Sequence, residues 1–252
     1  MLRRNALRFV LALLGALPPM AGCLKASASG PSGPGAGILF VGNSLTYWND
    51  LPLIVQAVFD AARGTTYDVG MVAFPDVSLE DHWLDGTARQ QIERGGWQIV
   101  VLQQGPSSLP ESRTLLRDYV GRFSERIKSI GARPALYSVW PSQSRQADFD
   151  RAIESYKLAA DDVGGMYFPV AAAWRAVWQR DSAVALYSPD GLHPSVAASY
   201  LAALVMYGVI ANKTPIGLPS EIPLRDGRPL VIQAALAATL QAAAAEAIQA
   251  AR

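Results

Sequence analysis

Short apolar runs alternate along the chain with longer stretches in which apolar residues recur every three or four positions. Continuous apolar runs are typical of parallel strands buried on both faces, and they occur at residues 38–41, 66–73, 97–103, 134–139 and 166–169. The longer stretches predict helices at residues 51–62, 79–94, 112–130, 149–163, 171–179, 195–210 and 230–251. Strands that alternate with helices imply a parallel sheet covered on both faces.

A single α/β domain over residues 37–252 accounts for this order of elements. Half of the 252 residues are hydrophobic, which is enough for a large core. Right-handed crossovers leave few topologies. The simplest is a three-layer α/β/α fold with a five-stranded, parallel, flavodoxin-like sheet of strand order 2-1-3-4-5. Its first strand lies beside the switch point, where α/β sheets bind ligands.

Residues 1–22 have the pattern of an export signal. Three arginines precede an apolar stretch at residues 9–17 that is too short to span a bilayer. Met20-Ala21-Gly22-Cys23 resembles a bacterial lipobox, with Met20 where leucine is usual, and Cys23 is the only cysteine. We expect lipid attachment at Cys23; a secretory signal cleaved near residues 26–28, and an uncleaved anchor or a chance apolar start, are the alternatives. The Ser/Gly/Pro-rich residues 23–36 predict a flexible tether.

Charge narrows the range of partners. The net charge is +1, and removal of residues 1–22 takes away three arginines and no acid. A near-neutral chain lacks the basic footprint of a nucleic-acid-binding protein. We expect an exported protein of the bacterial cell envelope, either lipid-anchored or periplasmic or secreted, whose contact with a membrane is the N-terminal lipid anchor.

Ser44 stands where the first predicted strand ends and the chain turns toward a helix. Gly42 allows a tight turn, so the Ser44 hydroxyl and N–H can face outward at the ligand-binding edge of the sheet. The alternative is a serine that only bonds to the turn backbone. One of two histidines, His193, follows Asp190 by three residues in a polar loop. A carboxylate at that spacing can hold one imidazole nitrogen and leave the other as a base, or it can merely make a turn bond.

Together, Gly42-Asn43-Ser44-Leu45 and Asp190-Gly191-Leu192-His193 resemble the Gly-Asp-Ser-Leu and Asp-x-x-His blocks of the SGNH/GDSL hydrolase family. The similarity extends from about residue 38 to about residue 210. It implies the SGNH fold, with Ser44 as nucleophile, His193 as general base and acid, and Asp190 as the residue that orients the histidine. Thr46 replaces the second glycine of the Gly-x-Ser-x-Gly elbow, which argues against the α/β-hydrolase family.

The family's other two blocks differ here, and they concern the oxyanion hole. The resemblance assigns one donor to the Ser44 N–H and aligns Asp76 with the glycine that supplies a second N–H. The asparagine of the third block is absent, and Ser107 stands in its place. Gln104 is the expected replacement donor, with Gln103 or Ser107 as alternatives. Loss of one such donor costs about 100- to 1000-fold in rate; alternatively, the glutamines only satisfy the strand edge.

Aromatic residues near predicted strand ends complete the candidate site. Trp48 and Trp140 could stack on a sugar ring or hold an acyl chain, although tryptophans more often pack in a core. His82 could line the cleft, although a histidine at the surface or in the packing is the alternative. We expect no metal and no cofactor, because no cluster has metal-ligand spacing and no glycine loop is built for phosphates.

The sequence therefore predicts a serine esterase (a carboxylic ester hydrolase) that removes short acyl groups, acetyl first, from carbohydrate or other small-molecule esters. One alternative is a non-catalytic envelope protein that holds glycan or lipid in the same cleft. The other is an O-acyltransferase that passes the acyl group from the same triad to a sugar.

Overall fold

A parallel sheet forms the centre of the fold, as the apolar runs predicted. The computed structural model describes residues 26–27 and 36–252. The strands of the main sheet are β1 (Ala26–Ser27), β2 (Ala36–Gly42), β3 (Tyr67–Ala73), β4 (Trp97–Leu102), β5 (Arg133–Tyr137) and β6 (Met166–Phe168), in the order β1-β3-β2-β4-β5-β6. The last five pair in parallel, and β1 pairs antiparallel with β3 at the edge. The parallel strands thus have the predicted order 2-1-3-4-5.

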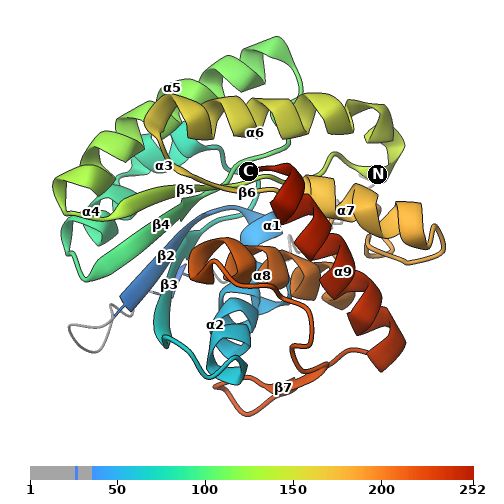
Figure 1. Cartoon of the computed structure of the whole chain (residues 1–252). Coiled ribbons are helices and arrows are strands. Elements are labelled where there is room, and N and C mark those ends of the chain that lie inside the picture. The colour runs from blue at the N-terminus through green and yellow to red at the C-terminus, as the bar shows by residue number, and fades with distance from the viewer. Residues whose placement is uncertain (1–25, 28–35) are drawn as a thin grey trace, which may run out of the picture.

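Helices cover both faces of this sheet and make the predicted three layers (Figure 1). They are α1 (Ser44–Tyr47), α2 (Leu51–Ala61), α3 (Leu79–Asp85), α4 (Thr87–Glu93), α5 (Pro110–Ser129), α6 (Phe149–Val163), α7 (Val170–Arg180), α8 (Val196–Ala211) and α9 (Ala234–Ala250). Two 3-10 helices, η1 (Trp48–Asp50) and η2 (Gln143–Asp148), precede α2 and α6. Helices α3 to α6 lie on one face, and α2, α8 and α9 lie on the other, with α7 packed against α8 and α9 (Figure 1).

The central strand β2 is the most deeply enclosed part of the sheet. Its residues Ile38, Leu39, Phe40 and Val41 are at most 1 % exposed. Side chains of alternate residues point to opposite faces of a sheet, so an apolar residue at every position fits a strand with helices on both sides. The carboxyl end of β2 is therefore held rigidly where the chain leaves the core.

Two predicted helices differ from the structure by more than two residues. The predicted helix over residues 79–94 is broken into α3 and α4 at Gly86, whose φ of 87° lies in the left-handed region. Glycine adopts this conformation without a Cβ penalty and commonly ends a helix. The C-terminal helix starts at Ala234 rather than at residue 230, because β8 (Pro229–Val231) pairs with β7 (Glu221–Pro223) in a separate hairpin.

The predictions for the N-terminus fall mostly outside the described residues. These are the signal peptide, the lipidation of Cys23 and the tether apart from Ala26, Ser27 and Ala36. Among the helices of residues 36–252, none combines the length and apolar character that a bilayer crossing requires.

Candidate active site

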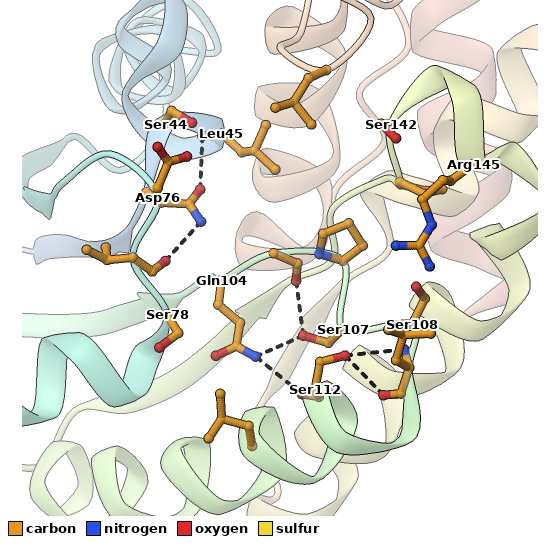
Figure 2. A pocket seen from close by; sticks show the side chains of 18 of the residues that line it. Ser44, Leu45, Asp76, Ser78, Gln104, Ser107, Ser108, Ser112, Ser142 and Arg145 are labelled. Atoms are coloured by element: carbon orange, nitrogen blue, oxygen red, sulfur yellow. Dashed lines mark hydrogen bonds between the residues drawn. The ribbon is translucent and has the colours of Figure 1, made fainter.

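Ser44 lies at the turn from β2 into α1. β2 ends at Gly42, and Asn43 caps α1 by accepting a 3.1 Å hydrogen bond from the Leu45 N–H on its Oδ1. Ser44 is the first residue of this short helix, so its N–H has no acceptor within the helix. It lines a pocket of about 520 Å³ (Figure 2). This is the strand–turn–helix position that the sequence predicted for the serine.

A buried amide holds this turn from below. Gln103 is fully buried, and its Oε1 accepts hydrogen bonds from the Asn43 N–H at 2.9 Å and the Thr46 hydroxyl at 2.7 Å. Its Nε2 donates to Asn43 Oδ1 at 2.9 Å and to the Gln104 carbonyl at 2.5 Å. Gln103 does not line the pocket. Gln103 is therefore not placed to donate to an oxyanion, the alternative considered for it, because it lies outside the pocket and both polar atoms of its amide are engaged.

His82 also supports the turn and does not line the pocket, contrary to the prediction. It is 1 % exposed, and its Nε2 lies 2.7 Å from the Gly42 carbonyl, which assigns the proton to Nε2. Its Nδ1 has no hydrogen-bond partner in the part of the chain that the structure describes. Burial lowers the pKa of His82, so the imidazole is neutral. Its bond to the Gly42 carbonyl stabilises the end of β2.

The loop before α8 presents His193. Asp190 Oδ2 lies 2.6 Å from Nδ1 of His193, and Asp190 Oδ1 accepts the backbone N–H groups of Leu192 and His193, each at 2.9 Å. The Leu192 N–H, followed by the His193 ring and the His193 N–H, lowers the pKa of Asp190 to about 2. The ionised carboxylate assigns the proton to Nδ1 of His193 and leaves Nε2 as an acceptor.

The segment that follows Ser44 contacts the histidine loop directly. The indole of Trp48 stacks on the imidazole of His193, with ring centroids 3.9 Å apart and an angle of 17° between the planes. Asn49 Nδ2 donates to the Pro194 carbonyl at 3.0 Å and to Ser199 Oγ at 2.9 Å. Trp48 therefore contacts the predicted base and lies outside the pocket lining in which substrate contact was expected.

The serine hydroxyl itself is not bonded to the imidazole here. Within residues 36–252, no hydrogen bond joins Ser44 Oγ to His193, and His193 does not line the pocket, whereas its neighbour Leu192 does. Catalytic hydrogen bonds are commonly long before substrate binds. The contacts of Trp48 and Asn49 bring the two loops together at the carboxyl edge of the sheet.

Three of the predicted oxyanion residues besides Ser44, namely Asp76, Gln104 and Ser107, line the pocket. Asp76 lines it in a left-handed conformation, with φ of 55°. Gln104 lines it too, but its Nε2 already donates to Ser107 Oγ at 2.9 Å and to the Ser112 carbonyl at 3.4 Å (Figure 2). Its Oε1 accepts from the Leu79 N–H at 3.1 Å. Gln104 is thus placed to donate only when one of these bonds is released.

Trp140 packs in the core, which corrects its prediction as a substrate contact. Its ring is fully buried and stacks on Trp174 at 3.8 Å between centroids. Its Nε1 donates to the Leu192 carbonyl at 3.0 Å, so Trp140 supports the histidine loop from inside.

The sequence analysis missed much of the pocket lining. The unpredicted polar members are Ser78, Asp81, Ser108, Ser112, Ser142 and Arg145, and the apolar members include Leu45, Leu109, Leu115 and Leu192. Ser142 and Arg145 follow the carboxyl end of β5, and position after a parallel strand is the signal that could have found them. Across residues 26–27 and 36–252, no group of three or more His, Cys, Asp or Glu side chains could hold a metal ion.

No protein-family model and no curated protein matches the sequence. Among solved structures, a protein from Slackia heliotrinireducens that is assigned as an SGNH hydrolase is 30 % identical, with 70 % of this chain and 99 % of that chain covered at a TM-score of 0.61. A DUF4886 family protein from Bacteroides uniformis is 19 % identical, with coverages of 85 % and 95 % and a TM-score of 0.70.

An acetylxylan esterase from Geobacillus stearothermophilus has the same fold at 14 % identity, with 73 % of this chain and 96 % of that chain covered at a TM-score of 0.55. The similarity to the Slackia heliotrinireducens protein covers nearly all of that chain. The fold and the two sequence blocks at Ser44 and His193 agree with it, and this chain belongs to the SGNH hydrolase family.

Proposed function

We propose that this hydrolase cleaves carboxylic esters through Ser44, His193 and Asp190. The observation that carries the proposal is the arrangement of the histidine loop: Asp190 holds Nδ1 of His193 at 2.6 Å, and Trp48, four residues after Ser44, stacks on the same ring. A serine beside a base that a carboxylate orients is the arrangement that nucleophilic acyl transfer requires.

In the reaction, Ser44 Oγ attacks the ester carbonyl carbon while Nε2 of His193 takes the hydroxyl proton. The tetrahedral intermediate collapses, the C–O bond to the alcohol breaks, and His193 returns the proton to the leaving alcohol. A water molecule, deprotonated by His193, then attacks the acyl-enzyme and releases the carboxylic acid and free Ser44. Asp190 keeps the imidazole in the required tautomer and balances the charge of the imidazolium.

The oxyanion is held by the N–H groups of Ser44 and Asp76 and by the amide of Gln104. The 3.4 Å bond from Gln104 Nε2 to the Ser112 carbonyl is the longer of the two that this nitrogen makes, and it is the one that a bound oxyanion replaces. Such donors stabilise the charge that develops in the transition state. Because Gln104 Nε2 is already hydrogen-bonded within the protein, its position also fits the second candidate, a non-catalytic protein that binds glycan or lipid in the same pocket.

Acetyl groups on carbohydrate are the proposed substrate. Four serines line the pocket, and because their O–H groups donate within the protein, their oxygens are left to accept from sugar hydroxyls: Ser78, Ser107, Ser108 and Ser112. The pocket of about 520 Å³ also suits a small acyl group on a sugar unit. The acetylxylan esterase of the same fold fits this choice.

The test compares the purified domain with Ser44→Ala on p-nitrophenyl acetate, butyrate and octanoate and on acetylated oligosaccharides. Ser142→Ala, another pocket serine, is the matched control. We expect the Ser44 variant to lose turnover of every ester and labelling by a fluorophosphonate, while the control keeps the labelling and the turnover of p-nitrophenyl acetate. Equal rates for wild type and Ser44→Ala would refute the hydrolase mechanism and favour the binding protein. Acyl transfer to added sugar in preference to water would identify an O-acyltransferase.

We further infer export with a lipid anchor at Cys23, on the strength of the lipobox-like Met20-Ala21-Gly22-Cys23 sequence. Cys23→Ser should move the protein from the membrane fraction of a bacterial host to the soluble fraction. Unchanged fractionation would contradict the anchor.

A further inference from the structure

The pocket has a cationic end. Figure 2 shows Ser44 and Arg145 on opposite sides of the pocket, and both line it. Arg145 lies in η2, which follows the end of β5, and its side chain is 51 % exposed. A substrate that extends across the pocket from Ser44 therefore reaches a guanidinium group.

The charge of this end is not cancelled by its neighbours. The carboxylate of Asp148, whose side chain is 8 % exposed, contacts Arg145 at 2.5 Å and also contacts Arg151. Burial alone would raise the pKa of Asp148, but the two arginines lower it. One carboxylate between two guanidinium groups leaves a net positive charge at this end of the pocket.

The guanidinium also keeps donors for a ligand. The ion pair with Asp148 is made through Nη2 of Arg145, whereas its Nε and Nη1 make no hydrogen bond to the residues that the structure describes. Nε and Nη1 lie on different edges of the guanidinium, so each can donate one charge-assisted hydrogen bond to a ligand carboxylate, and a fork of two parallel bonds also uses the second N–H of Nη2. The hydroxyls of Ser108 and Ser142 line the same region of the pocket.

The opposite end has the opposite charge. Asp76 lies beside Ser44 in Figure 2, and Asp81, in the first turn of α3, lines the same pocket. An anionic group on the substrate is therefore repelled near Ser44 and attracted near Arg145. This polarity fixes the direction in which a charged substrate lies.

The position of Arg145 relative to the base is fixed by the backbone. The Gln143 N–H, at the start of η2, donates to the Gly191 carbonyl at 2.8 Å. Gly191 lies in the loop that carries Asp190 and His193. The cationic end and the predicted base are therefore parts of one connected pair of loops.

We propose that Arg145 binds a carboxylate on the alcohol part of the substrate, so that the preferred substrates are acylated acidic sugars. This inference rests on the proposed ester hydrolysis and names its substrate class. The carboxylate pairs with Arg145, the sugar hydroxyls bond to the pocket serines, and the acyl group lies at Ser44.

The experiment uses a pair of substrates that differ only in charge: the methyl glycoside of acetylated galacturonic acid and its carboxamide. We expect wild-type kcat/KM to be at least about tenfold higher for the acid, because hydrogen bonds to a charged group are stronger. Arg145→Gln should remove that preference by lowering kcat/KM for the acid more than kcat/KM for the carboxamide.

Arg151→Gln is the matched control, because it removes the same charge from the same Asp148 but Arg151 does not line the pocket. It should keep the preference for the acid. Equal kcat/KM for the two substrates in wild type, or equal loss of the preference in both variants, would overturn the proposal.

A binding measurement separates this inference from the proposed reaction. Calorimetric titration of Ser44→Ala with the deacetylated methyl galacturonoside needs no turnover. Binding that Arg145→Gln in the same background abolishes would support the carboxylate site even if the protein hydrolyses no ester. Binding that is unchanged by Arg145→Gln would refute the site even if Ser44 proves to be the nucleophile.

Discussion

Gln103 is expected to be the most sensitive single polar residue beneath the site. In Gln103→Leu, the Asn43 N–H and the Thr46 hydroxyl lose the acceptor that they share. The other two partners keep a second bond: Asn43 Oδ1 still accepts from the Leu45 N–H, and the Gln104 carbonyl still accepts from the Tyr156 hydroxyl. The substitution thus leaves two buried donors unsatisfied.

Each unsatisfied buried donor costs about 1–3 kcal/mol, so Gln103→Leu should lower the free energy of unfolding by about 2–6 kcal/mol. For a chain of this size, that corresponds to a fall in Tm of at least about 4 °C. Urea unfolding followed by circular dichroism measures the change, with the m-value checked for constancy.

The matched control is Gln91→Leu. Gln91 is 4 % exposed, and its side chain makes no hydrogen bond within the described residues. Both variants replace a glutamine of low exposure by leucine, but only Gln103→Leu breaks hydrogen bonds within the protein, because the amide of Gln91 is not enclosed. A free energy of unfolding for Gln103→Leu within about 0.5 kcal/mol of that for Gln91→Leu would refute the reasoning, since surface-like effects are of that size.

Three further predictions concern the same region. In Gly42→Ala, the new Cβ would lie 2.4 Å from Thr46 Oγ1, so overpacking should lower the free energy of unfolding by about 1–3 kcal/mol. Urea unfolding measures this change, and an unchanged urea midpoint would contradict the close contact. Trp48→Leu should lower kcat about 2- to 30-fold with little change in KM, because the indole that stacks on His193 stabilises the imidazolium mainly in the transition state. A change confined to KM would argue against this role of Trp48. Because the pKa of Asp190 is lowered to about 2, its carboxylate stabilises the fold above about pH 4, and this stability is lost as the pH falls through about 2. The urea midpoints of wild type and Asp190→Asn should therefore converge toward pH 2, and a difference that stays constant with pH would contradict the lowered pKa.

The sheet could be predicted because its strands are continuously apolar and each is followed by a helical pattern. The break at Gly86 could not, since helical periodicity continues on both sides of it and only the tertiary path requires a left-handed residue there. The β7–β8 hairpin was missed for a similar reason: residues 229–231 adjoin an alanine-rich stretch, and their pairing with residues 221–223 is a long-range contact.

The site shows the same limit at single residues. Gln103 and Gln104 are neighbours at the end of β4, and neighbours in an extended segment point to opposite sides. One therefore faces the turn beneath Ser44 and the other the pocket, and the sequence could not say which. Trp48 and Trp140 were chosen alike from their places near strand ends, yet one stacks on His193 and the other on Trp174 in the core.

The relative positions of Ser44, His193 and Arg145 are set by contacts between loops as well as by the sheet. Trp48 and Asn49 join the turn after Ser44 to the histidine loop, and the Gln143 N–H joins that loop to η2 at Gly191. Each of these contacts involves residues far apart in the sequence. Because the three loops are linked in series, a change at the middle loop displaces both of its neighbours. Substitutions that loosen the histidine loop should therefore weaken nucleophile activation and carboxylate selection together.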